Sequence, residues 1–268
     1  MTTVYGDLVR YRELFASLFR RDLQARYKGS VFGLAWSLAN PVVQMGVYAL
    51  VFSVLWQVTG DSLKPYPLFL LSGLAVWVFF AGSLQSASRS MVDNANLIRK
   101  TRFPRQLLPF SSLGTQLVAF GVMLVVLVPL ELALRPEVRD TVWLAIPLSL
   151  LVVALVGGLS LVVASLNAIY RDVEHLVSAL LLPWFFLTPI LYTIDNLPGA
   201  AADYGWLADG LRYVNFLAPA VDAIRDPLFF GELPRAIDVV YLCVSAALAL
   251  ALGAFVFSRV DDRMAVEL

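Results

Sequence analysis

Four cations lie close together in the segment NANLIRKTRFPRQLLP, residues 94–109, between two long apolar runs. They are Arg99, Lys100, Arg102 and Arg105, within seven positions. Such a cluster can bind an acidic protein surface or anionic lipid headgroups. It can also act as a topology signal, since lysine and arginine in short loops hold those loops on the cytoplasmic side of a membrane.

The same segment predicts a short helix. Asn94 and Asn96 belong to the residue types that cap helix N-termini, and Pro104 stops a helix within about two turns. A short helix with apolar side chains and a cationic rim is suited to docking in a groove of a partner protein. The apolar side chains that it carries are Leu97, Ile98 and Phe103.

The chain offers little else that can do chemistry. Its three lysines, Lys28, Lys64 and Lys100, complete no G-x-x-x-x-G-K-[ST] phosphate-binding loop, and no G-x-S-x-G nucleophile motif occurs. One histidine, His175, and one cysteine, Cys243, make no metal site with ligand spacing. We therefore expect no catalysis, no metal and no cofactor in this chain, and we expect Cys243 to be a buried, inert thiol.

The composition indicates a membrane protein. The chain is 59% hydrophobic and 15% charged, whereas about a quarter of the residues of a soluble domain are charged. A bilayer core about 30 Å thick needs roughly 20 apolar residues per helix. The sequence predicts an all-α polytopic fold in one membrane domain (1–268), with six spans at 37–58, 66–88, 107–130, 142–166, 176–194 and 237–257.

The distribution of cations predicts the orientation of these spans. Fourteen of the twenty lysines and arginines fall before the first span, in alternate loops or after the last span, so both termini are expected in the cytoplasm. No Asp, Glu, Lys, Arg or His lies near the middle of a span, which disfavours ion-coupled transport. Any uphill transport then needs energy from a separate subunit.

Two further segments flank the spans. Residues 10–36 predict an interfacial helix and its connector, because apolar residues from Tyr11 to Phe19 recur at helical spacing beside several arginines. A simple membrane anchor is the alternative. Residues 195–236 are apolar but are cut by four prolines into pieces too short to span a bilayer.

Three segments carry a family resemblance that covers nearly the whole chain. They are RYKGSVFGLAWSLANP at 26–41, NANLIRKTRFPRQLLP at 94–109 and YRDVEHLVSALLLPWFFLTPILY at 170–192. In them the sequence resembles the transmembrane permease of a type-2 ABC transporter, in the branch that exports cell-surface polysaccharides such as O-antigen, teichoic acid and galactan. One departure is Phe216, where relatives often place a second proline.

The resemblance implies that residues 94–103 are a coupling helix that docks on a separate ATPase subunit. The residues with this role are Asn94, Asn96, Leu97, Ile98, Arg99, Lys100, Arg102, Phe103 and Pro104. The interfacial helix borders it, with a gate formed by Arg20, Arg21, Arg26, Tyr27 and Lys28. Arg171 and Asp172 would form a second cytoplasmic contact or gate; the alternative is a local ion pair worth under about 1 kcal/mol. Residues 195–236 would form re-entrant helices.

The expected cargo is a lipid-linked glycan, typically carried on undecaprenyl diphosphate. Aromatic faces can stack on sugar rings, although belts of lipid-facing aromatics are general in membrane proteins. The residues expected on the translocation path are Trp36, Trp77, Phe80, Trp184, Phe185 and Tyr192.

The resemblance also implies the partners. We expect a homodimer in the bacterial inner membrane with two ATPase copies, which bind the ATP and magnesium, and no nucleic acid. Export of a small drug or antibiotic by the same architecture is an alternative. A membrane scaffold that binds cytoplasmic partners and transports nothing is another.

Overall fold

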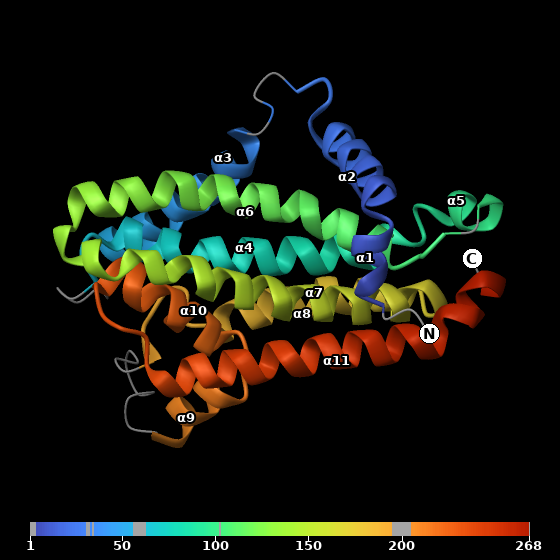
Figure 1. The fold of residues 1–268 in the computed structure, drawn as a ribbon. Helices are drawn as coiled ribbons and strands as arrows, with labels where there is room; N and C mark the ends of the chain where they lie inside the picture. Colours follow the sequence, from blue (N-terminus) through green and yellow to red (C-terminus); the bar gives the residue numbers. More distant parts are fainter. Residues whose placement is uncertain are drawn as a thin grey trace.

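The structure is a computed structural model that describes residues 4–30, 33, 35–55, 63–101, 103–194 and 205–267, and its regular elements there are all helices. Four helices are long and apolar enough to cross a membrane, and they run side by side in Figure 1. They are α4 (Tyr66–Ser90), α6 (Leu107–Leu134), α7 (Ala145–Ile169) and α11 (Ala236–Glu267). Their predicted counterparts began within three residues of these bounds, because long apolar runs have few alternatives to a helix.

Two shorter helices cover the remaining predicted spans. α3 (Ala35–Ala49) continues as the π-helix η1 (Leu50–Leu55), and the end of the predicted first span falls outside the described residues. α8 (Asp172–Leu187) ends seven residues before the predicted fifth span does. Thr188 is extended, at φ −92° and ψ 137°, because the ring of Pro189 disfavours a helical residue before it. Residues 188–194 are therefore a turn.

A close crossing holds α7 against α11. A Cβ at Gly158 would overlap the backbone of Ala249, and a Cβ at Gly253 would lie 2.6 Å from the carbonyl oxygen of Gly158. Small residues let helix backbones approach in this way within membranes. Cys243 in the same helix is exposed, so the expectation that this thiol is buried is wrong.

The N-terminal helices lie against one end of the bundle (Figure 1). α1 (Gly6–Arg10) and α2 (Arg12–Tyr27) correspond to the predicted interfacial helix. The hydroxyl of Ser111 in α6 donates to Asp22 at 2.6 Å, and the ring of Phe19 fills the space beside Gly114. α2 is therefore attached to α6 by its buried face, while its arginines remain accessible.

The short helix α5 (Ala95–Lys100) lies at the same end and confirms the helix predicted in this segment. A second apolar cluster packs beneath it, separate from the main core of the bundle. The buried residues of this second cluster include Leu18, Met91, Ile98, Leu107 and Phe257.

Short helices gather at the opposite end of the bundle. They are η3 (Pro136–Asp140), η4 (Val142–Leu144), α9 (Gly205–Tyr213), α10 (Ala218–Arg225) and the π-helix η7 (Asp226–Phe230). Of these, α9, α10 and η7 lie in the segment 195–236, which was predicted to be cut into short pieces by its prolines; residues 195–204 lie outside the described residues. η7 ends at Gly231, whose φ of +70° favours glycine.

Candidate functional site

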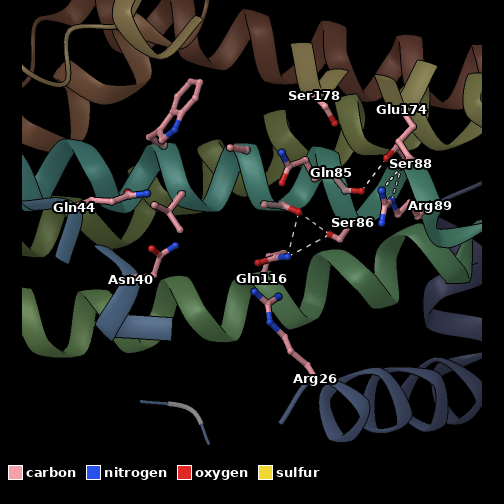
Figure 2. A pocket seen from close by; sticks show the side chains of 14 residues that line it. Arg26, Asn40, Gln44, Gln85, Ser86, Ser88, Arg89, Gln116, Glu174 and Ser178 are labelled. Atoms are coloured by element: carbon pink, nitrogen blue, oxygen red, sulfur yellow. Dashed lines mark hydrogen bonds and ion pairs between the residues drawn. The ribbon is translucent and has the colours of Figure 1, made fainter. Parts of the chain in front are cut away.

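A polar cleft of about 610 Å³ lies among the apolar helices. One face of α4 forms its floor, because Val78, Ala81, Gln85 and Arg89 recur every three or four residues and so point the same way. α2, α3, α6 and α8 supply the other walls. The polar lining residues are Arg26, Asn40, Gln44, Gln85, Ser86, Ser88, Arg89, Gln116, Glu174 and Ser178 (Figure 2).

Close packing of α6 on α4 fixes one amide of the cleft. The Gln116 amide donates to the carbonyl oxygen of Gly82 at 3.1 Å and to the Ser86 hydroxyl at 3.4 Å. A Cβ at Gly82 would lie 2.9 Å from the Gln116 side-chain oxygen, so glycine at this position makes room for the amide. Both of these bonds are made by the amide nitrogen, and the Gln116 oxygen accepts no hydrogen bond from the part of the chain that the structure describes.

An ion pair stands where α4 and α8 meet beside the cleft. Nε of Arg89 donates to Oε1 of Glu174 at 2.6 Å, and a second guanidinium nitrogen contacts the same oxygen. Asn167 in α7 supports both helix ends, because its amide donates to the Ser88 carbonyl at 2.7 Å and its oxygen accepts from the Glu174 backbone at 2.9 Å. Three helices are thus joined at this point.

The predicted gate residues on α2 have different surroundings. Arg26 lines the cleft, and its guanidinium lies 5.9 Å from the centroid of the Tyr27 ring. Arg21 bonds to the neighbouring Asp22 at 2.8 Å, and Arg20 and Lys28 are exposed. Of the predicted cations, Arg26 is the one that the structure brings to the cleft.

The predicted path aromatics are mostly packed against one another. Trp77 lines the cleft, while Phe80 and Phe185 are buried beside it, with ring centroids 5.7 Å and 5.4 Å from that of Trp77. Trp184 also packs on Phe80 and donates to the Asn215 side chain at 2.9 Å. These four aromatic residues form one cluster.

Two predicted path residues lie apart from that cluster. The Tyr192 hydroxyl donates to the carbonyl oxygen of Phe186 at 3.1 Å. Trp36 is 56% exposed near the start of α3. The path role of all six aromatics stays a prediction.

The structure turns the apolar side of α5 inward. Ile98 is only 8% exposed, and Leu97 and Phe103 pack on the same second cluster. Asn94 stands at the N-cap position, but its amide donates to the Ser90 carbonyl at 2.8 Å instead of capping the helix. Pro104 is half-buried after the helix, and Arg102 lies outside the described residues.

The outward surface of α5 is polar and cationic, because Asn96, Arg99 and Lys100 are exposed. Arg105 pairs with Asp261 of α11 at 2.9 Å, so it does not contribute to this surface. Arg171 and Asp172 are exposed at the start of α8, at the same end of the bundle. Any partner at this end therefore meets charged groups first.

Sequence reasoning missed the amides of the cleft. Asn40, Gln44, Gln85 and Gln116 lie in or beside apolar runs, where a polar side chain is costly unless it faces protein or water. That cost was a usable signal. The sequence gives no signal for the pairing of Glu174 with Arg89, since 85 residues separate them.

The comparisons with known proteins agree on one family. Residues 13–229 match the model of the ABC-2 type transporter family. The chain is 34% identical to an O-antigen export system permease protein RfbA from Myxococcus xanthus, over 75% of this chain and 76% of that protein. It is 31% identical to a protein of the same name from Klebsiella pneumoniae, over 94% of each.

A more distant relative has a related description. The chain is 20% identical to the polysialic acid transport protein KpsM of Escherichia coli, over 92% of this chain and 93% of that protein. The apolar helices, the cleft among them and the family match together make the chain an integral membrane protein. It belongs to the ABC-2 type transporter family.

Proposed function

We propose that this chain is the permease of an ATP-driven exporter that moves a lipid-linked cell-surface polysaccharide, such as undecaprenyl-diphosphate-linked O-antigen, across the bacterial inner membrane. The polar cleft is the observation that carries the proposal, because a row of amides and hydroxyls among apolar helices suits a hydroxyl-rich cargo. The relatives described as O-antigen and polysialic acid transport proteins favour a glycan over a drug.

The proposed assembly has two copies of this chain and two copies of an ATPase that binds ATP and magnesium. Closed two-fold symmetry is the commonest arrangement of identical subunits, and two clefts facing each other make a wider path than one. α3 with η1 and α8 supply the two spans that complete the count of six. The described part of the predicted re-entrant segment, residues 205–236, enters the membrane from the outside in this proposal.

The proposed orientation puts the end that carries α5 in the cytoplasm, together with both termini. The excess of cations in the corresponding segments supports it. α5 then faces the ATPase with Asn96, Arg99 and Lys100, so the matching surface of the ATPase is acidic. Motion of the ATPase reaches α4 and α6 because α5 lies between them in the chain.

Charge reversal on α5 tests this function. We would purify the chain with the ATPase encoded beside it, as wild type, as Lys100→Glu and as Arg139→Glu. Lys100 and Arg139 are both exposed, but Arg139 lies in η3 at the opposite end of the bundle. A like charge across an interface costs several kcal/mol, so Lys100→Glu should reduce recovered ATPase at least about tenfold while Arg139→Glu does not.

Cells supply the second measurement. Deletion of the gene should remove the glycan from the cell surface, and the wild-type and Arg139→Glu forms should restore it. A chain that recovers no ATPase would support a scaffold. Intact surface glycan with lost export of a drug would instead support a drug exporter.

A further inference from the structure

The ionisable residues that line the cleft are unevenly matched. Two guanidinium groups, Arg26 and Arg89, face one carboxylate, Glu174. Arg89 bonds to Glu174, whereas Arg26 forms no hydrogen bond or ion pair with any residue that the structure describes. The lining therefore carries one more positive side chain than negative side chains.

In the pair of Arg89 and Glu174, the carboxylate occupies the position on the guanidinium group that a bound phosphate would take. An arginine fork binds phosphate and carboxylate oxygens by the same geometry, so the two groups compete for one guanidinium. Glu174 is held in place through its backbone, since Asn167 accepts from its amide at 2.9 Å. Its carboxylate can leave Arg89 without moving the bonded backbone.

Arg89 remains accessible even when it is paired. Its side chain is 63% exposed, and that of Glu174 is 22% exposed. The hydroxyl of Ser178 and the amide of Gln85 line the same cleft and offer further donors (Figure 2). These are the partners that the oxygens of a multivalent anion require.

We propose that Arg89 binds a phosphate or diphosphate ester in the cleft, that Arg26 contributes a second guanidinium group from the wall formed by α2, and that Glu174 occupies Arg89 while the site is empty. Two guanidinium groups favour a phosphate over a single carboxylate, which one arginine can satisfy. The inference rests on the proposed function in one respect: a lipid-linked glycan carries such an ester next to its first sugar.

Ligand binding has a structural consequence. The Arg89–Glu174 pair joins the C-terminal end of α4 to the first turn of α8. When a phosphate takes Arg89, Glu174 loses its counter-charge and is repelled by the incoming anion. Its carboxylate then turns away from Arg89 while Asn167 holds its backbone, and the side-chain link between α4 and α8 is lost where the ester has bound.

Pyrophosphate binding tests the site with the full chain in detergent, by calorimetry at fixed salt. A charge-assisted contact to phosphate is worth enough that Arg89→Gln should weaken binding about tenfold or more. Glu174→Gln removes the competitor and should tighten binding about two- to fivefold, in line with a partly exposed ion pair. Arg139→Gln, at the opposite end, is the control and should change nothing.

Arg89→Gln is expected to weaken pyrophosphate binding and Glu174→Gln to tighten it, and these opposite changes in affinity distinguish a binding site from a structural ion pair. If the pair only holds the fold, both variants lose stability alike and neither changes pyrophosphate affinity in the expected direction. Elution as one sharp peak shows that a variant is folded. Arg26→Gln, at an exposed residue without an ion pair in the described part of the chain, gives a second weakening variant should Arg89→Gln misfold.

A second arm distinguishes the source of the phosphate. The chain in nanodiscs with undecaprenyl diphosphate, and in nanodiscs without it, is titrated with pyrophosphate. Competition by the lipid identifies a headgroup site, and equal titration in both discs identifies a site for free phosphate. No binding of either probe, or weaker binding by Glu174→Gln, overturns the inference.

The two proposals fail differently. If the ATPase complex and the surface glycan are intact while pyrophosphate and the lipid do not bind, the site is wrong and the exporter stands. If pyrophosphate binds, and the two variants change its affinity in the expected directions, but no ATPase is recovered, then the proposed phosphate site holds and the proposed export function is wrong.

Discussion

The guanidinium carbon of Arg225 lies 4.0 Å from the centroid of the Phe69 ring, inside the chain and only 1% exposed. Its nitrogens donate to the carbonyl oxygens of Pro189 and Ile190, at 2.6 and 3.2 Å. One buried cation thus joins α10, α4 and the turn after α8. Removing the partners of a buried charge costs far more than an exposed contact does.

The fit of Arg225 predicts the effect of Gly73→Ala. A Cβ at Gly73 would overlap Nη2 of Arg225, so the guanidinium must shift and lose hydrogen bonds. We expect a loss of about 1–3 kcal/mol of stability, measured as a lower melting temperature in detergent. Gly121→Ala is the control, because nothing lies within 4 Å of its Cβ position. Equal melting temperatures for the two variants would contradict the close fit of the Arg225 guanidinium group against Gly73.

The crossing of α7 and α11 predicts a larger effect for Gly158→Val. The new side chain meets the backbone of Ala249, which cannot rotate away as a side chain can. We expect a loss of at least about 3 kcal/mol, seen as aggregation during purification. Gly46→Val in α3 is the control, with open space around its Cβ position. A monodisperse Gly158→Val protein would show that the helices do not cross this closely.

Stability should depend on pH through Asp226 in η7. Burial raises the pKa of Asp226 from 3.8 to about 7; Asp222 and Asp238 add to the rise, while Arg235 and Arg225 oppose it. The folded chain therefore keeps a proton that the unfolded chain releases between these values. The free energy of unfolding falls as the pH rises from about 4 to about 7, and the loss is complete above the folded pKa.

Asp226→Asn isolates this effect. The amide carries no charge at any pH, so the variant should melt higher than the wild type at pH 8 and vary less between pH 5 and pH 8. Thermal melts across this range measure both. Parallel curves for the two proteins would mean that Asp226 does not titrate in this window.

The double contact of Asn167 predicts local loosening in Asn167→Ala. The variant loses the bonds to the Ser88 carbonyl and the Glu174 amide, at about 1–3 kcal/mol for buried groups left unsatisfied. Hydrogen exchange should rise in the first turn of α8. Exchange in α11 should stay the same, and a uniform rise throughout the chain would instead indicate global destabilisation.

Length and composition predicted the four long helices, because an apolar run of 20 or more residues in a membrane protein has few alternatives to a helix. Pro104 and the preceding asparagines likewise predicted α5. The side that α5 buries was not predictable, since Ile98 belongs to a cluster whose other members include residues as distant in sequence as Leu18 and Phe257. The cleft depends on how α6 crosses α4, and only that crossing brings Gln116 to Gly82.

The exposed thiol on α11, a helix long enough to cross a membrane, gives each copy of the chain a single labelling site. Cys243 is the only cysteine, so one spin label attaches per copy without any substitution. No second labelled thiol in the chain adds further distances to the measurement. In an assembly of two copies such a label yields one distance distribution, whose width reports how rigidly the two helices are held. A monomer yields none, which makes subunit number and helix mobility readable from one spectrum.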